Sequence, residues 1–280
     1  MIVTDRKPKS TPNPPIVIAA IIVAVIYLSL ILILPAINVF YQAFKGGVPS
    51  FITSINNSEF FSSLALTLLI AIIVVPINVG FGLCAAWVIA RHQFRGKTLL
   101  LSVLDVPFSI SPVVAGLMMI LLYGDRGWFG GILQAVGIKV IFSVPGMVLA
   151  TAFVTLPFVA REVIPVLEEI GMEQEEAART LGASDWQVFW RVTLPNIRWG
   201  LLYGVILTNA RSMGVFGAVS VISGNIAGKT QTLSLYVEDA YKQYQTQSAF
   251  SAAILLACLG LVTLVIKEII EQKTKIHDIE

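Results

Sequence analysis

Charged side chains are scarce in this chain. Asp, Glu, Lys and Arg make up 13% of its 280 residues and hydrophobic residues 56%, whereas a soluble domain carries about 25% charged residues. A soluble core of this size cannot bury so much apolar surface, which excludes a soluble enzyme and a disordered chain. The formal net charge of +2 is too small to indicate a nucleic-acid partner. The low content of charged residues and the high content of hydrophobic ones indicate a protein that lies in a membrane.

Cysteine and histidine are equally rare, with two of each. Cys84 and Cys258 sit in apolar runs, which does not suggest a disulfide framework. His92 and His277 lie in polar segments without a nearby set of metal ligands. We therefore expect no metal site, no catalytic site and no cofactor within this chain.

Long hydrophobic runs, in contrast, are abundant, and a helix needs about 20 apolar residues to cross a membrane. The first run is longer than the roughly 7–15 residues of a signal-peptide core, so it is predicted to be an uncleaved anchor. The sequence predicts an all-α, polytopic membrane protein: a six-helix transmembrane domain over residues 16–270, a cytoplasmic N-terminal segment 1–15 and a tail 271–280. The expected spans are Ile16–Phe40, Phe61–Ala90, Leu99–Tyr123, Val144–Val166, Trp199–Ser223 and Ala249–Ile270.

The distribution of Lys and Arg between these spans predicts the orientation. With the N-terminus inside, thirteen of the nineteen cations fall on inner segments and five on outer ones, and Arg211 remains inside a span. Both termini are therefore predicted to be cytoplasmic.

Prolines and glycines interrupt several spans. Such interruptions are tolerated where neighbouring helices or a water-filled cavity satisfy the freed backbone groups. Simple kinking is the alternative at any one position, but together they favour a transport bundle. The predicted breaks are Pro76 with Gly80 and Gly82 in the second span, Pro107 and Pro112 in the third, and Pro157 and Pro165 in the fourth.

One long polar segment, residues 168–198, separates the fourth and fifth spans. Glu173–Leu181 are good helix formers, and Gly182 suits the position that ends a helix. Ser184 or Asp185 is predicted to cap a second short helix, Trp186–Val192, that stops before Pro195. Its apolar residues share one face, which predicts a docking knob for a partner; a surface hairpin without a partner is the alternative.

This segment resembles the EAA motif of binding-protein-dependent ABC importer permeases. Glu176-Ala177-Ala178, Gly182 and Leu194-Pro195 match the pattern E-A-A-x3-G-x9-I-x-L-P, and only Val192 departs from it. The resemblance implies the six-helix, MetI-like core of a type I importer. It also implies that these residues couple to a cytoplasmic ATPase dimer, which would hold the ATP–Mg.

Further runs narrow the resemblance to the sulfate/thiosulfate permeases, and to their W-type subunit. The matching runs are Asp105–Gly124, Phe142–Leu167, Leu181–Arg211 and Phe216–Gly224. The resemblance implies a second, T-type permease and a periplasmic sulfate-binding protein as partners, with sulfate as the substrate and possibly thiosulfate. Where the family is expected to have Gly-Glu-Phe-Gly, this chain has Gly214-Val215-Phe216-Gly217.

Arg211 is the sharpest single candidate for the substrate path, because a membrane-embedded arginine is a functional candidate by default. The alternative is a structural ion pair, for which Asp105 in the third span is an available partner. Asn209 and Ser212 are hydrogen-bond donors at similar depth and further path candidates, although small polar residues also serve helix packing.

Two other functions remain open at this point. Molybdate and tungstate share the shape and charge of sulfate, so a molybdate or tungstate ABC permease is the nearest alternative. A channel or carrier that works without ATP is a second alternative, and it would not need the amphipathic segment.

Overall fold

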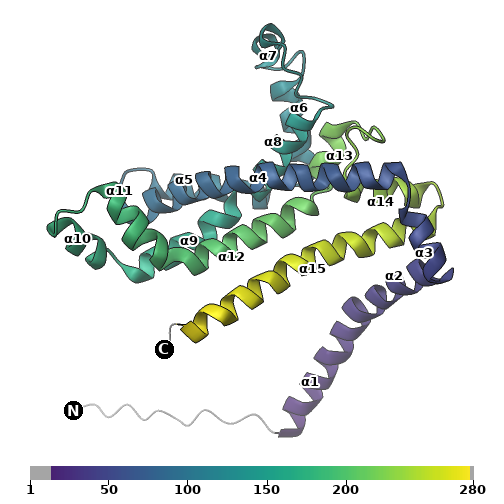
Figure 1. Ribbon diagram of the computed structural model, residues 1–280, viewed down its shortest axis with the longest axis horizontal. Coiled ribbons are helices and arrows are strands. Elements are labelled where there is room, and N and C mark those ends of the chain that lie inside the picture. Colours follow the sequence, from purple (N-terminus) through teal and green to yellow (C-terminus); the bar gives the residue numbers. More distant parts are fainter. Residues whose placement is uncertain (1–13, 278–280) are drawn as a thin grey trace.

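A computed structural model describes residues 14–277, and it is helical with no strand within that range. The predicted terminal segments therefore fall partly outside the described residues, at positions 1–13 and 278–280. Figure 1 shows these helices. In chain order they are α1 (Pro14–Leu28), η1 (Ser29–Ile33), α2 (Leu34–Phe44), α3 (Gly47–Ile55), α4 (Ser58–Arg91), α5 (Lys97–Ser109), α6 (Pro112–Tyr123), α7 (Gly130–Val136), α8 (Val144–Thr155), α9 (Pro157–Ile170), α10 (Glu173–Thr180), α11 (Asp185–Val188), η2 (Phe189–Thr193), α12 (Leu194–Met213), α13 (Gly217–Ser223), α14 (Leu233–Lys242) and α15 (Thr246–His277).

Among residues 14–277, four helical stretches are long and apolar enough to cross a membrane. Two further spans are bent pairs: α5 with α6, at 109°, and the helix Asp185–Met213 with α13, at 51°. Counting each bent pair as one span gives six, which is the predicted number. The continuous spans are Val17–Phe44, Ser58–Arg91, Val144–Ile170 and Thr246–Ile266.

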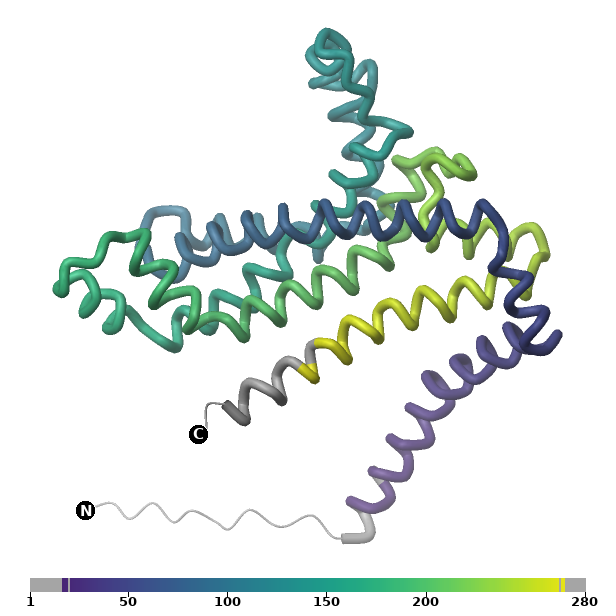
Figure 2. The backbone as a smooth tube through the Cα atoms, viewed as in Figure 1, coloured from purple at the N-terminus to yellow at the C-terminus, as the bar shows by residue number. Residues whose placement is uncertain are grey.

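The long helices α4, α9, α12 and α15 lie along one another and form a bundle (Figure 1). Helices α10 and α11 lie at one end of this bundle, and α3 and α14 lie at the other end. Helices α6 and α7 project sideways from it. The tube in Figure 2 shows that α1 leaves the bundle at an angle, while α2 packs on α15.

Most of the predicted proline breaks are wrong. Helix α4 runs without interruption through Pro76, and Pro107 and Pro165 likewise lie inside α5 and α9. Helices α8 and α9 do separate directly before Pro157, but Leu156 between them keeps helical angles, so the two helices still form one span. The third span does break directly before Pro112, where it bends.

The fifth span also differs from its prediction. The chain does not stop before Pro195 but continues as one helix from Asp185 to Met213. The π-helix η2 precedes the proline, and the N–H of Leu194 bonds the carbonyl of Phe189 five residues back. This wider turn lets Pro195 stand in the first turn of α12, where a missing N–H costs little.

Helix packing is close where glycine faces a backbone. A β-carbon on Gly204 would lie 2.9 Å from the Cα of Val159, and one on Gly82 would lie 2.6 Å from the Cβ of the same residue. Two glycines thus bring α4 and α12 onto the same point of α9. Small residues serve this purpose in membrane helices, because lipid supplies no hydrophobic drive for their association.

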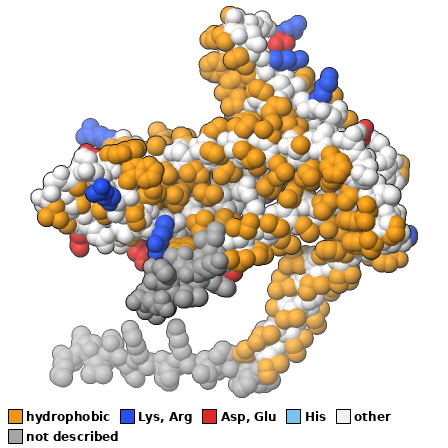
Figure 3. All heavy atoms as spheres, in the orientation of Figure 1, with side chains coloured by type: hydrophobic (Ala, Val, Ile, Leu, Met, Phe, Trp, Pro, Cys, Tyr) orange, Lys and Arg blue, Asp and Glu red, His pale blue; other side chains and the backbone are white. Residues whose placement is uncertain are grey.

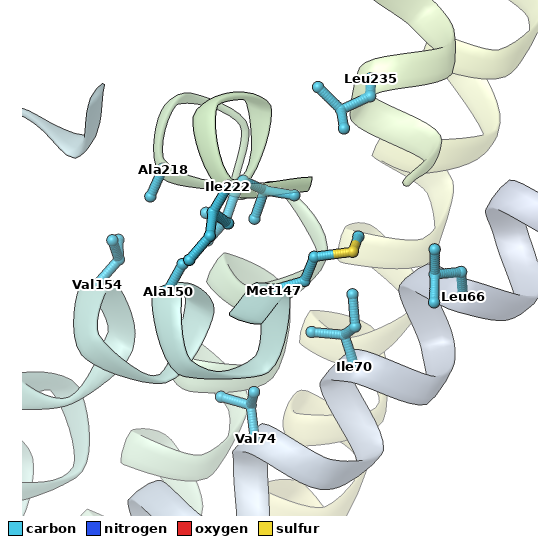
Figure 4. Close-up of a cluster of buried hydrophobic side chains, with 11 residues drawn as sticks. Leu66, Ile70, Val74, Met147, Ala150, Val154, Ala218, Ile222 and Leu235 are labelled. Carbon is cyan, nitrogen blue, oxygen red and sulfur yellow. The ribbon is translucent and has the colours of Figure 1, made fainter. Parts of the chain in front are cut away.

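The largest buried cluster joins α4, α8, α13 and α14 (Figure 4). Ile70 of α4 and Met147 of α8 point toward each other, with Ile222 of α13 and Leu235 of α14 nearby. This cluster holds the bent part of the fifth span against the second and fourth spans.

Apolar side chains cover most of the face seen in Figure 3. The charged side chains visible there lie mainly at the end with α10 and α11 and at the tip with α7. This distribution is typical of a bundle whose middle lies in lipid.

Candidate functional site

The segment that carries the E-A-A motif, residues 171–193, forms two short helices around Gly182, as predicted. We call it the motif segment. The N–H of Gly182 donates to the carbonyl of Arg179 at 2.9 Å, and that of Ala183 to the carbonyl of Ala178 at 3.1 Å. These two bonds define a Schellman end, with Gly182 at φ +87° in the position that favours glycine.

The second short helix begins at Ser184, one of the two predicted caps. The Ser184 hydroxyl accepts from the backbone N–H of Gln187, while the Gln187 side chain accepts from the N–H of Ser184. This capping box satisfies two helix-end donors. Because α11 continues through η2 into α12, the motif segment is an extension of the fifth span.

A buried ion pair ties the motif segment to the bundle. Arg91, the last residue of α4, donates from Nη2 to Oε1 of Glu175 in α10 at 2.9 Å, and both side chains are only 4% exposed. The hydroxyl of Thr193 donates to the same Oε1, also at 2.9 Å. The arginine and the hydroxyl donor offset the free-energy cost of burying the carboxylate, whereas either charge buried alone would destabilise the protein.

Arg91 has a second role at the end of α9. Its Nη1 donates to the carbonyl of Leu167 at 2.7 Å, in the last turn of a helix, where carbonyls lack intrahelical partners. Sequence reasoning missed this network, because Arg91 and Glu175 stand 84 positions apart and Glu175 precedes the motif rather than belonging to it. The unusual run of three acids in the first turn of α10 was the only available signal.

The motif segment exposes large apolar side chains among its polar ones. Leu181 is 88% exposed and Trp186 70% exposed, and Trp186 packs edge-on against Trp190. The predicted coupling residues divide between surface and interior: Glu176, Ala177, Gly182 and Pro195 are exposed, and Ala178 and Leu194 are partly buried. Large apolar side chains exposed beyond the bundle mark an interaction surface.

A groove separates the motif segment from the last turns of α4. It encloses about 430 Å³ and is lined by Cys84 and Trp87 on one side and by Trp186 and Phe189 on the other. Glu175 and Thr193 also reach its wall. The buried ion pair between Arg91 and Glu175 therefore joins α4 to the motif segment at the edge of this groove.

The predicted path residues do not form one cluster. Arg211 lies exposed in the last turn of α12. Ser212 and Thr208 are buried toward the bundle, and the Ser212 hydroxyl donates to the backbone carbonyl of Asn209 at 2.8 Å. Arg211 is thus presented outward, while Ser212 bonds its own helix.

The expected partner of Arg211 is paired elsewhere. Asp105 accepts from Nη2 of Arg161 at 2.7 Å and from its Nε at 2.9 Å. A pair between Asp105 and Arg211 is therefore not formed, and Arg211 makes no ion pair with any of the acidic residues that the structure describes. Val215, which stands where a glutamate was expected, is buried in the core at 5% exposure, so a charge there would face apolar neighbours.

The described residues include no group of three or more His, Cys, Asp or Glu side chains placed to hold a metal ion. Cys84 and Cys258 are both free and exposed.

Six apolar spans within residues 14–277, two of them bent, and a helical segment that extends beyond the bundle define a polytopic membrane protein. The chain belongs to the family described as binding-protein-dependent transport system inner membrane component, which matches residues 78–276.

Its relatives include the sulfate transport system permease protein CysW of Synechocystis sp., 66% identical over 92% of this chain and 93% of that protein. The CysT permease of the Escherichia coli sulfate transport system is 40% identical over 85% of this chain and 87% of that protein. The fold matches a chain in the crystal structure of a bacterial ABC transporter involved in alginate import, with a TM-score of 0.79 at 18% identity over 92% of this chain and 95% of that one.

Proposed function

We propose that this chain is a transmembrane permease subunit of an ATP-driven importer that carries sulfate into the cytoplasm. The observation that supports this proposal most directly is the 66% identity, over 92% of the chain, to a sulfate permease of the W type. The family membership and the motif segment support the ATP-driven class over a channel or carrier that works alone.

The motif segment is the proposed docking surface for the ATPase dimer, which holds the ATP–Mg. Leu181, Trp186 and Trp190 form its exposed apolar face, and Gly182 sets the angle between the two short helices. Glu176, Ala177, Ala178, Leu194 and Pro195 are the proposed coupling residues by their match to the family motif. We propose that both ends of the chain lie on the cytoplasmic side of an inner membrane, as the distribution of Lys and Arg between the spans favours.

The second proposed partner is a related permease of the T type. The similarity of this chain to both sulfate permease types supports a pair of two homologous subunits. A periplasmic sulfate-binding protein completes the proposed assembly, as the family description implies.

Arg211 is the proposed path residue, because it is a cation on the exposed side of a bent span and has no acidic partner among the described residues. Sulfate is a dianion, and an arginine fork suits oxyanion geometry. Ser212 is less suited, since its hydroxyl is bonded to the backbone; Asn209 is partly exposed and stays a candidate.

The proposed mechanism is alternating access. Closure of the ATPases on ATP moves the motif segment, and the helix Asp185–Met213 carries that movement directly into the fifth span. The cavity between the two permeases then opens outward, the binding protein delivers the anion, and hydrolysis restores the inward-open state.

A growth experiment tests the substrate. A bacterial strain that lacks this chain should fail to grow on limiting sulfate and should recover when the chain is restored, while its growth on limiting molybdate stays normal. Loss of growth on molybdate instead would refute the sulfate proposal and support the molybdate alternative.

A further inference from the structure

Helix α10 carries the E-A-A motif but has no apolar face with which to attach itself to the bundle. Its eight residues read EQEEAART, and the structure describes all of them. Glu175 is the one residue among them that is buried, at 3% exposure. The helix is therefore anchored through polar side chains: through Glu175, and through Gln174, whose Oε1 accepts from Nδ2 of Asn196 in α12 at 2.6 Å.

The motif segment is joined to the bundle along the chain at both of its ends. Helix α11 continues through η2 into α12, so its movement reaches the fifth span along one uninterrupted helix. Only Gly171 and Met172 separate α10 from the end of α9, so the fourth span is connected to it through these residues. The second span has no such connection. It is joined to the segment by the ion pair between Glu175 and Arg91 at the end of α4, and Arg91 also bonds the carbonyl of Leu167 in α9.

We propose that Arg91 and Glu175 form the link through which movement of the motif segment reaches the second span. The second span then moves as one body with the fourth and fifth spans, which continue into the segment along the chain. The inference rests on the proposed function, because it requires an ATPase that moves the segment. Arg91 and Glu175 are positioning residues, since neither is placed to touch sulfate or ATP.

Arginine is the side chain that this link requires. Its Nε and Nη2 bond one carboxylate oxygen at 3.2 and 2.9 Å, while Nη1 bonds the Leu167 carbonyl at 2.7 Å. The planar fork holds both partners at fixed angles, whereas the compact ammonium of lysine does not bond all of them at once. Arg91→Lys therefore keeps the buried charge but loosens the connection.

The ion pair and the helical connection through η2 meet at one atom. Thr193, the last residue of η2, donates to the same Oε1 of Glu175 that accepts from Arg91. Oε1 thus joins α10, η2 and α4, and through Arg91 it joins α9. A displacement of α10 cannot occur without moving these three neighbours or breaking a bond that burial makes costly to leave unmade.

Breaking the link should uncouple ATP hydrolysis from sulfate import rather than abolish either activity. The ATPases would still move the fourth and fifth spans along the chain, but the second span would follow poorly. ATP would then be hydrolysed in cycles that do not open the path, so the number of ATP molecules hydrolysed per sulfate imported should rise.

The test uses the complete complex in proteoliposomes, with sulfate import and ATP hydrolysis measured in the same vesicles. Arg91→Lys and Glu175→Gln should assemble with the ATPase and raise the ratio of ATP to sulfate by a factor of about 5 or more, the factor that a weakening of about 1 kcal/mol produces. The matched control is the Lys97–Glu168 pair, at 3.6 Å between α5 and α9, with side chains 22% and 53% exposed. Lys97→Gln with Glu168→Gln should leave the ratio unchanged.

An unchanged ratio in assembled Arg91→Lys would overturn the proposal, as would an equal rise in the control. If Arg91→Lys does not assemble, Thr193→Val decides the matter, because it removes one donor and keeps the ion pair. An assembled Thr193→Val complex should show a smaller rise, and an unchanged ratio there would also overturn the link. The unmodified complex tests the function separately: its failure to import sulfate would refute the sulfate importer, whereas normal import with an unchanged variant ratio would refute only the link.

Discussion

Replacing Gly182 with valine should impair coupling without a steric clash. Gly182 has φ +87°, and a β-carbon built on it meets no atom within 4 Å. The free-energy cost of the substitution therefore comes from the backbone conformation alone. It is about 1–2 kcal/mol for an L-residue in the left-handed region, and β-branched residues such as valine tolerate this region least. Asparagine tolerates this region better than valine.

This cost acts on the turn between α10 and α11. A penalty of about 1–2 kcal/mol lowers the population of the correctly bent motif segment relative to alternatives by a factor of about 5–30. Binding-protein-stimulated ATPase activity and sulfate uptake should fall by a similar factor, because the ATPase meets the segment in the wrong shape. The chain should still insert and assemble, since Gly182 packs against nothing.

The assay is stimulated ATP hydrolysis by the assembled complex in proteoliposomes. Gly228→Val is the matched control: Gly228 has φ +74° and equally open surroundings, but it lies between α13 and α14, away from α10 (Figure 1). The control should keep its stimulated activity, and Gly182→Asn should be less impaired than Gly182→Val. Full activity in Gly182→Val, or equal loss in the asparagine variant, would refute this account of the turn.

Three further predictions concern the spans. Arg211→Gln should raise the sulfate concentration needed for half-maximal uptake about tenfold, since a charged hydrogen bond contributes roughly 1.5–3 kcal/mol; normal uptake kinetics with normal assembly would contradict the path assignment. Gly204→Leu should reduce the amount of folded chain recovered by size-exclusion chromatography, because its β-carbon would lie 2.9 Å from the backbone of Val159. Gly80 has open space around it, so Gly80→Leu should not reduce the amount of folded chain. An equal loss of folded chain in both variants would contradict the packing argument. Asp105→Asn breaks a half-exposed ion pair and should change the free energy of unfolding by less than about 1 kcal/mol; loss of assembly would give this pair a larger role.

Local signals in the sequence were reliable. Helix formers from Glu173 and the glycine at 182 predicted the two short helices and their turn, because both depend on residues within one or two turns of each other. The six apolar runs likewise predicted the spans, since length and hydropathy are properties of each run alone.

The predictions that failed concern either side chains that are distant from each other in the chain or prolines that a helix can accommodate in more than one way. Pro76 does not break α4, and a π turn carries the helix through Pro195; neither outcome can be read from the proline itself. Asp105 pairs with Arg161 rather than Arg211 because helix bends decide which side chains meet. The Arg91–Glu175 pair depends on how α4 and α10 end beside each other, which no periodicity encodes.

The most direct test of the central claim is uptake of labelled sulfate by proteoliposomes that contain this chain, its second permease and the ATPase dimer, with the binding protein outside. The account predicts accumulation against a gradient that requires both ATP and the binding protein and that a molybdate excess does not suppress. Sulfate uptake that proceeds without ATP, or accumulation of molybdate in place of sulfate, would contradict it.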